Sequence, residues 1–186
     1  MKNLLFPLAL AFLMLCLSTS LYGTEESSIK VRYEERKPFK IIGLDIMSSS
    51  DSENYAQLFT DFVARMNEIE NRVSDDIYGL SFPGKDFDAQ TMEGSNYLVG
   101  MAVSDATQIP KGMILRETPG GNFAIFEHKG LAQTLGETYG YIFGKWIYSS
   151  GMKPTGYEMF EVYGKDYAPD NPDSIIEIWV PVFKYK

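Results

Sequence analysis

Acidic and aromatic residues alternate with aliphatic ones in the last strand-like segment, 174–183, and they are the residues best suited to chemistry. Successive side chains of a β-strand point to opposite faces, so Glu177 and Trp179 share one face and the intervening Ile and Val residues share the other. An ionised carboxylate beside an indole ring attracts a flat or cationic organic molecule through charge and cation–π contact. We therefore expect a ligand site on the Glu177 face.

The preceding strand-like segment, 157–163, supplies further candidates by the same alternation. Its even-numbered residues Phe160 and Val162 are expected on one face. Its odd-numbered residues are expected beside Glu177 and Trp179 in the ligand site: Tyr157, Met159, Glu161 and Tyr163. The pattern leaves an alternative open, because Tyr, Trp and Glu also suit a solvated sheet face that binds nothing.

His128 and the cysteine content limit other kinds of catalytic site. His128 is the only histidine, so a Ser-His-Asp catalytic triad would have to include it. No nucleophile-elbow pattern is present. Its place between a strand and the start of a helix favours a structural role. One histidine and one cysteine, Cys16, leave zinc without its usual ligands, so we expect no metal and no cofactor.

A run of acids before the last strand invites comparison with a calcium-binding loop. Glu177 is the twelfth residue counted from Asp166, the position of the bidentate glutamate in such loops. Ala168 and Asn171 stand where the motif requires an oxygen ligand and a glycine. The segment is therefore expected to be a solvated turn.

The composition fits one domain that folds without disulfides. The chain has 186 residues, of which 45% are hydrophobic and 14% aromatic, enough for a sizeable core. Its formal net charge is -8, which repels phosphate backbones, and we find no basic stripe to offset it. We expect no nucleic-acid partner.

The N-terminus is typical of a secretory signal peptide. Lys2 precedes an apolar run from Leu4 to Leu17, and small polar residues follow at 18–20. At 1.5 Å per residue this run spans about 21 Å, less than the roughly 30 Å of a hydrocarbon core, so a stable membrane span is disfavoured. Leu15 before Cys16 disfavours lipid anchoring. We expect a signal peptide at 1–23, cleaved between Ser20 and Gly23, a spacer at 24–28, and a periplasmic or secreted domain at 29–186.

The rest of the chain predicts two similar runs of elements. Extended structure at 29–46, interrupted at Pro38, precedes an amphipathic helix whose Ser50 and Glu53 have capping-box spacing. The remaining elements are strands at 77–82 and 96–104, a hairpin at 112–128 turning at Pro119, Gly120, Gly121 and Asn122, a helix at 131–148 stopped by Gly151, and strands at 157–163 and 174–183.

A short sequence repeat supports a duplicated module. Gly84-Lys85-Asp86-Phe87 recurs as Gly164-Lys165-Asp166-Tyr167, an offset of 80 residues, and the two helices are spaced similarly. Pseudo-repeats at about 29–104 and 112–186 then predict an α+β fold, a duplicated β-α-β-β module sharing one antiparallel sheet.

Three segments carry a resemblance to a known family: 118–130 (TPGGNFAIFEHKG), 141–146 (YIFGKW) and 173–182 (DSIIEIWVPV). They resemble the GyrI-like small-molecule-binding family, also called the AraC-type effector-binding family. The resemblance implies two helices on one sheet face, a ligand groove on the other, and a ligand-contacting acid on the last strand. Members of the family sense drugs within bacterial transcription regulators or act alone, and some relatives hydrolyse cyclopropane-bearing toxins. This chain is expected to depart from the family's regulators by carrying an export signal and by lacking a DNA-binding segment.

Three functions remain open from the sequence. The leading hypothesis is an exported, non-catalytic binder of an amphipathic or cationic organic molecule. One alternative is a hydrolase of strained or electrophilic small molecules in which Glu177 activates water. The other is a protein-interaction module whose groove accepts a peptide. The sequence leaves the ligand's identity and the oligomeric state open.

Overall fold

The protein is described here by a computed structural model covering residues 29–48, 52–88, 93–156 and 158–184. The helices are α1 (Ser52–Arg65), α2 (Leu135–Tyr141) and α3 (Ile147–Ser149). The strands are β1 (Val31–Arg36), β2 (Phe39–Met47), β3 (Arg72–Pro83), β4 (Ser95–Val103), β5 (Ile114–Thr118), β6 (Gly121–Lys129), β7 (Met152–Pro154), β8 (Met159–Tyr163) and β9 (Ile175–Lys184). The expected signal peptide, the spacer and the Ser50 end of the first capping box lie outside the described residues.

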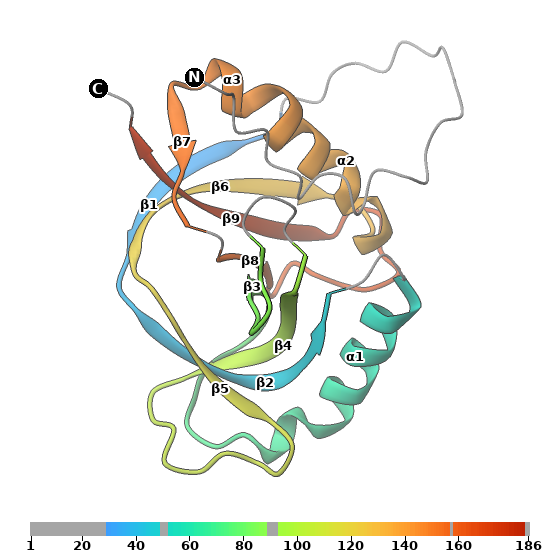
Figure 1. The fold of residues 1–186 in the computed structure, drawn as a ribbon. Coiled ribbons are helices and arrows are strands. Elements are labelled where there is room, and N and C mark those ends of the chain that lie inside the picture. The colour runs from blue at the N-terminus through green and yellow to red at the C-terminus, as the bar shows by residue number, and fades with distance from the viewer. Residues whose placement is uncertain (1–28, 49–51, 89–92, 157, 185–186) are drawn as a thin grey trace.

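The sheet is built from two halves that repeat the same order. Its strands run β1-β6-β9-β8-β3-β4-β2-β5, each antiparallel to its neighbours, and β7 pairs with the end of β9. Strands β2, β3 and β4 with α1 match β6, β8 and β9 with α2, so β3 and β8 meet where the halves join. Each copy of the four-residue repeat directly follows one of these two strands. The α+β prediction of one antiparallel sheet with its helices on one face is confirmed (Figure 1).

The expected hairpin at 112–128 was wrong, because β5 and β6 do not pair with each other. β6 pairs with β1 through Gly121 and Arg36, and β5 pairs with β2 through Thr118 and Phe39. This register sets Pro38 opposite Pro119, and neither proline can donate a backbone hydrogen bond to the ladder.

Both segments, β1–β2 and β5–β6, therefore bend at these prolines and continue into their second strand. A Cβ on Gly120 would lie 2.6 Å from the Arg36 carbonyl oxygen, so the two bends cross too closely for a larger residue. The first pair of the strand order, β1 and β6, continues through these bends into its last pair, β2 and β5. The sheet therefore curls into a nearly closed ring (Figure 1).

Two apolar clusters fill the space between the sheet and its helices. On α1, Leu58 and Phe62 pack on β2 and β4, and on the second helical segment Ile142 and Trp146 pack on β6 and β9. Ile176, Ile178 and Val180 belong to the second of these clusters, as the alternation in the last strand predicts.

The inner face of the curled sheet carries a third cluster, rich in aromatic rings. Its buried members come from six strands: Ile41, Tyr78, Leu80, Phe82, Leu98, Ala102, Phe123, Ile125, Phe160 and Trp179. Phe160 contacts the rings of Phe39, Phe123 and Trp179, with centroids 5.6, 5.3 and 5.2 Å away. The side of the sheet away from the helices is thus a packed aromatic layer.

The second helix is broken into short parts rather than continuous over 131–148. A 3-10 turn at Ala132–Thr134 leads into α2, and a π-helical stretch at Ile142–Trp146 separates α2 from α3. Isolated π-helical turns within helices are frequently found at functional sites. Across the described residues, no helix is long and apolar enough to cross a membrane.

Candidate functional site

The structure divides the predicted ligand site between the two faces of the sheet. Phe160 pairs with Trp179 and Val162 pairs with Glu177 across β8 and β9, and directly paired residues share a face. The odd-numbered residues of β8 therefore face the helices, and the sequence-based assignment of this strand was reversed. The error arose because antiparallel register, and not strand alternation alone, decides which residues become neighbours.

The six predicted site residues consequently fall into three groups. Met159, Glu161 and Tyr163 are buried on the helix side of the sheet. Glu177 and Trp179 lie on the inner face. Tyr157 lies outside the described residues.

Glu161 is a buried carboxylate held by three tyrosine hydroxyls. Tyr97 donates to Oε2 at 2.6 Å, Tyr163 donates to the same oxygen at 2.8 Å, and Tyr139 donates to Oε1 at 2.6 Å. The side chains come from β4, β8 and α2, and only 7% of Glu161 is exposed. Residues distant in the sequence thus converge on one charge where the two halves of the fold meet.

A glycine on the neighbouring strand makes room for this arrangement. Gly79 of β3 pairs directly with Glu161. A Cβ at Gly79 would lie 2.0 Å from the Tyr97 hydroxyl oxygen and 2.8 Å from Glu161 Oε2, both far inside van der Waals contact. The tyrosine and carboxylate therefore occupy the space that any other residue would fill.

Aromatic side chains from both helices border the Glu161 site. From α1, the Tyr55 ring contacts Tyr97 at 5.1 Å and the Phe59 ring contacts Tyr163 at 5.0 Å, measured between centroids. On the other helical segment, the rings of Tyr139 and Phe143 are nearly parallel, with centroids 6.3 Å apart. A single carboxylate walled by electron-rich rings is the combination that binds organic cations in water-poor surroundings.

No cation neutralises Glu161 in the described part of the chain, where none of the ion pairs includes it. Removing a carboxylate from water is costly unless hydrogen bonds compensate it, and the three hydroxyls provide that compensation. Burial raises the pKa of Tyr97, Tyr139 and Tyr163 well above the usual value, and the nearby Glu161 charge raises it further. The tyrosines therefore stay protonated and remain donors at neutral pH.

These raised pKa values predict how stability depends on pH. Above about pH 10 a tyrosine in the unfolded chain loses its proton while the folded one keeps it, so the free energy of unfolding falls as pH rises. Below that pH the contribution is fully present. Tyr139→Phe removes one of these protons, so the free energy of unfolding should fall less steeply with pH in this variant. Urea titrations between pH 9 and 11 measure the slope. Tyr148→Phe is the control, because Tyr148 is 69% exposed. Equal slopes in the two variants would contradict the burial of the Tyr139 hydroxyl.

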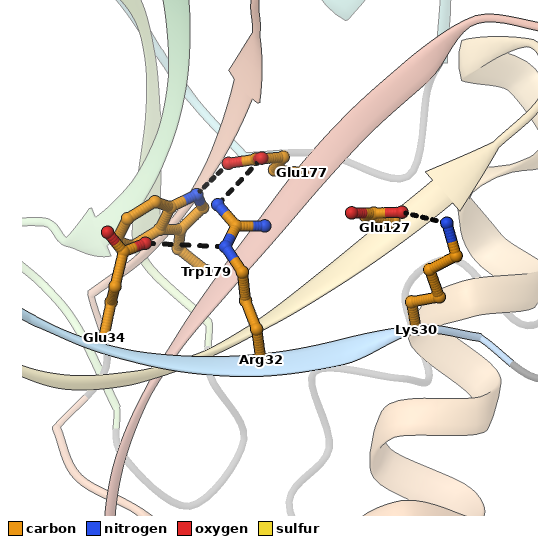
Figure 2. A network of polar contacts seen from close by, with 6 residues as sticks. All are labelled: Lys30, Arg32, Glu34, Glu127, Glu177 and Trp179. Carbon is orange, nitrogen blue, oxygen red and sulfur yellow. Dashed lines mark hydrogen bonds and ion pairs between the residues drawn. The ribbon is translucent and has the colours of Figure 1, made fainter.

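Glu177, on the opposite face, already has partners for both oxygens. Arg32 donates from Nη2 to Oε1 at 2.8 Å, and Trp179 donates from Nε1 to Oε2 at 2.9 Å (Figure 2). Glu127 pairs across the strands with Glu177 and forms its own ion pair with Lys30 at 3.5 Å. The charge of Glu177 is thus balanced within the protein, in contrast to that of Glu161.

His128 is buried and joins β6 to the start of the second helical segment. Its Nε2–H donates to the Leu131 carbonyl oxygen at 3.1 Å, and its Nδ1 lies 2.8 Å from the Thr138 hydroxyl oxygen. Only 4% of the residue is exposed. These contacts fit the structural role expected of it. Within the described residues, no group of three or more His, Cys, Asp or Glu side chains is arranged to hold a metal ion.

Of the tyrosines around Glu161, only Tyr163 was predicted from the sequence as a site residue. Tyr55 and Tyr139 lie within the two predicted helices, and Tyr97 lies within the strand predicted at 96–104. A buried tyrosine hydroxyl needs a hydrogen-bond partner, so three tyrosines at core positions indicate a polar group among them. Gly79 inside a strand is a further signal, because it marks a close approach by another group.

Known proteins resemble this chain in sequence. The family model of Cass2, integron-associated effector binding protein, matches residues 32–182. The transcriptional regulator BrlR of Pseudomonas aeruginosa is 26% identical over 159 residues, covering 84% of this chain and 56% of that regulator. This chain therefore spans little more than half of that relative's length.

Solved structures share the fold at low sequence identity. SAV2435 bound to tetraphenylphosphonium has a TM-score of 0.64 at 16% identity, covering 83% of this chain and 94% of that chain. The C-terminal domain of EcmrR has a TM-score of 0.62 at 17% identity, with coverages of 85% and 99%. An integron cassette protein of Vibrio cholerae has a TM-score of 0.59 at 14% identity, with coverages of 82% and 95%.

Proposed function

Because this chain belongs to the Cass2 family of integron-associated effector-binding proteins, we propose that it binds an amphipathic organic cation between α1 and α2, with Glu161 as its counter-ion. The aromatic rings of Tyr55, Phe59 and Phe143 would contact the apolar part of the ligand. Tyr97, Tyr139 and Tyr163 would orient the carboxylate. The chain then acts as an effector-binding domain for small molecules.

The observation that carries this proposal is the buried Glu161 carboxylate, which three hydroxyls bind and no described cation neutralises. A ligand cation placed beside it would supply the missing charge in surroundings of low effective dielectric, where the attraction is stronger than in water. Rings on both sides would add cation–π contact and exclude water.

Entry of a ligand requires the aromatic wall to move, because Glu161 is only 7% exposed. The second helical segment is suited to this movement: α2 has only 7 residues and ends in the π-helical stretch Ile142–Trp146. Its displacement would cost the hydrogen bond between Tyr139 and Glu161 and the contact between the Tyr139 and Phe143 rings. The ligand's own charge and rings would replace both.

Tetraphenylphosphonium is the natural probe, since the structural neighbour SAV2435 is bound to it. We expect this cation to raise the unfolding temperature, with a stabilisation of about 2.7 kcal/mol at one hundred times the Kd. Triphenylphosphine oxide, which has similar rings and no net charge, should stabilise the protein far less. Equal effects of the two compounds, or no effect of the cation at millimolar concentration, would contradict the proposal.

Hydrolysis by Glu177 gains no support from the site geometry. Both oxygens of Glu177 accept hydrogen bonds from the protein, which leaves this carboxylate poorly placed to activate water. We therefore retain the binding of a small molecule as the function.

We further propose that the domain works outside the cytoplasm, on the basis of the apolar run from Leu4 to Leu17 and the polar residues after it. Protein recovered from the cell envelope should then begin between Leu21 and Thr24. N-terminal sequencing of the envelope and cytoplasmic fractions checks this expectation. Finding the protein in the cytoplasm with Met1 intact would contradict it.

A further inference from the structure

Arg36 covers the aromatic layer on the inner face of the sheet, opposite the Glu161 site. Its guanidinium carbon lies 3.9 Å from the ring centroid of Phe39, 5.1 Å from that of Trp179, and 5.4 Å from those of both Tyr78 and Phe160. The side chain is half-buried at the end of β1, where the chain bends at Pro38. Four rings from four strands thus hold one cation at the surface of this layer.

This guanidinium has hydrogen-bonding capacity to spare. It donates from Nη2 to the Tyr78 hydroxyl oxygen at 2.9 Å, whereas an arginine side chain carries five N–H donors. Among the described residues, no ion pair joins Arg36 to a carboxylate. The electron-rich faces of the rings around it stabilise its charge.

Two acids beside this layer, Glu177 and Glu158, are engaged by other arginines. Arg32 binds Glu177 and lies 5.7 Å from the Trp179 ring centroid, so this indole is contacted by two guanidiniums. Arg116, over the ring of Phe82, forms an ion pair with Glu158. Glu34, two residues before Arg36 on β1, forms a second ion pair with Arg32 at 3.5 Å (Figure 2). Among these three arginines, Arg36 is the one that none of the described ion pairs includes.

Space for a bound molecule exists on the same side of the sheet. An open recess of about 330 Å³ is lined by Arg32 and by its neighbours Lys30, Val31, Ile125 and Glu127. Its two cations, Lys30 and Arg32, are paired with Glu127 and Glu177. Arg36 does not line the recess, but Ile125 pairs directly with Trp179, and the Arg36 guanidinium lies over the Trp179 ring. A flat molecule resting there would lie on Ile125, next to Trp179.

We propose that the inner face is a second ligand site, which takes a flat aromatic anion such as a carboxylate or sulfonate. The remaining N–H groups of Arg36 would form charge-assisted hydrogen bonds to the anion. A planar guanidinium can offer two parallel donors to one carboxylate or sulfonate. The ring of the ligand would lie against Trp179. This site is separate from the Glu161 site, on the opposite face of the sheet, and has the opposite charge preference.

Calorimetric titration with 2-naphthoate, using neutral 2-naphthamide and cationic N-methylquinolinium as matched probes, tests this proposal. The wild-type protein should bind naphthoate at least about tenfold more tightly than naphthamide. Arg36→Gln should remove that preference, and Arg36→Lys should retain part of it. Arg65→Gln makes the same charge change at an exposed ion pair with Glu68 and should alter nothing.

Two results would overturn the proposal: equal affinities of the wild type for naphthoate and naphthamide, or equal naphthoate affinities in Arg36→Gln and Arg65→Gln. Tighter binding of N-methylquinolinium than of naphthoate, enhanced by Arg36→Gln, would instead identify Arg36 as an internal substitute for a cationic ligand. Should Arg36→Gln not fold, the wild-type comparison alone decides. Glu161→Gln should leave naphthoate binding unchanged, so failure of one site is distinguishable from failure of the other.

Discussion

Glu161→Gln is expected to weaken the binding of tetraphenylphosphonium by about 10- to 100-fold, the usual range for losing a charge-assisted contact. Glutamine has the shape of glutamate, and its carbonyl oxygen can still accept hydrogen bonds from tyrosines. The amide nitrogen of glutamine cannot accept a hydrogen bond, so at least one tyrosine loses its acceptor, while neutralising the buried charge offsets part of that cost. The loss should therefore be larger in cation binding than in unfolding.

Glu177→Gln is the matched control, because it makes the same chemical change on the opposite face of the sheet. The Glu177 charge is already engaged by Arg32, so removing it should change the affinity for tetraphenylphosphonium by less than about threefold. Calorimetric titration of both variants and the wild type makes the comparison. The reverse ranking, with the larger loss in Glu177→Gln, would move the cation site to the inner face.

Phe160→Ala is expected to lower the free energy of unfolding by about 3–5 kcal/mol, a large fraction of the stability of an ordinary domain. Phe160 is 2% exposed and contacts the rings of Phe39, Tyr78, Phe123 and Trp179. Its removal would leave a cavity that residues on six different strands cannot easily close. Urea titration followed by circular dichroism measures the effect.

Tyr148→Ala provides the comparison for this second prediction, since the residue is 69% exposed and its loss should cost little. A similar, small effect of both substitutions would mean that the inner aromatic layer is loosely packed. The layer would then be a groove open to ligands over its full extent. The ring contacts around Phe160 favour a packed layer whose ligand access is limited to its edge near Arg36 and Arg32.

Much of the fold is predictable from local patterns. The apolar stripe of the first helix and the alternation of Ile176, Ile178 and Val180 in the last strand each follow from a single segment, and each agrees with the structure. Such patterns depend on one element facing one core, so no knowledge of its neighbours is needed.

The parts that could not be predicted depend on pairs of distant segments. The face of β8 follows from its register with β9, in which even-numbered residues oppose odd-numbered ones. The bend at Pro119, expected to be a hairpin turn, depends on its position opposite Pro38. No pattern within either segment contains that information.

The two glutamates illustrate the same limit in the candidate site. Glu161 and Glu177 both lie in alternating strands among aromatic residues, and the sequence gives no reason to separate them. The structure places a cation against Glu177 and three hydroxyls against Glu161. Their different roles arise from Arg32, Tyr97 and Tyr139, which lie far from them in the chain.

The most direct test of the cation site is nuclear magnetic resonance of protein labelled with carbon-13 at the tyrosine ring, titrated with tetraphenylphosphonium. Signals of Tyr97, Tyr139 and Tyr163, assigned through single Tyr→Phe variants, should shift together as the ligand reaches Glu161, and the signal of Tyr78 on the inner face should stay in place. A shift of Tyr78 with the other three unchanged would contradict the account.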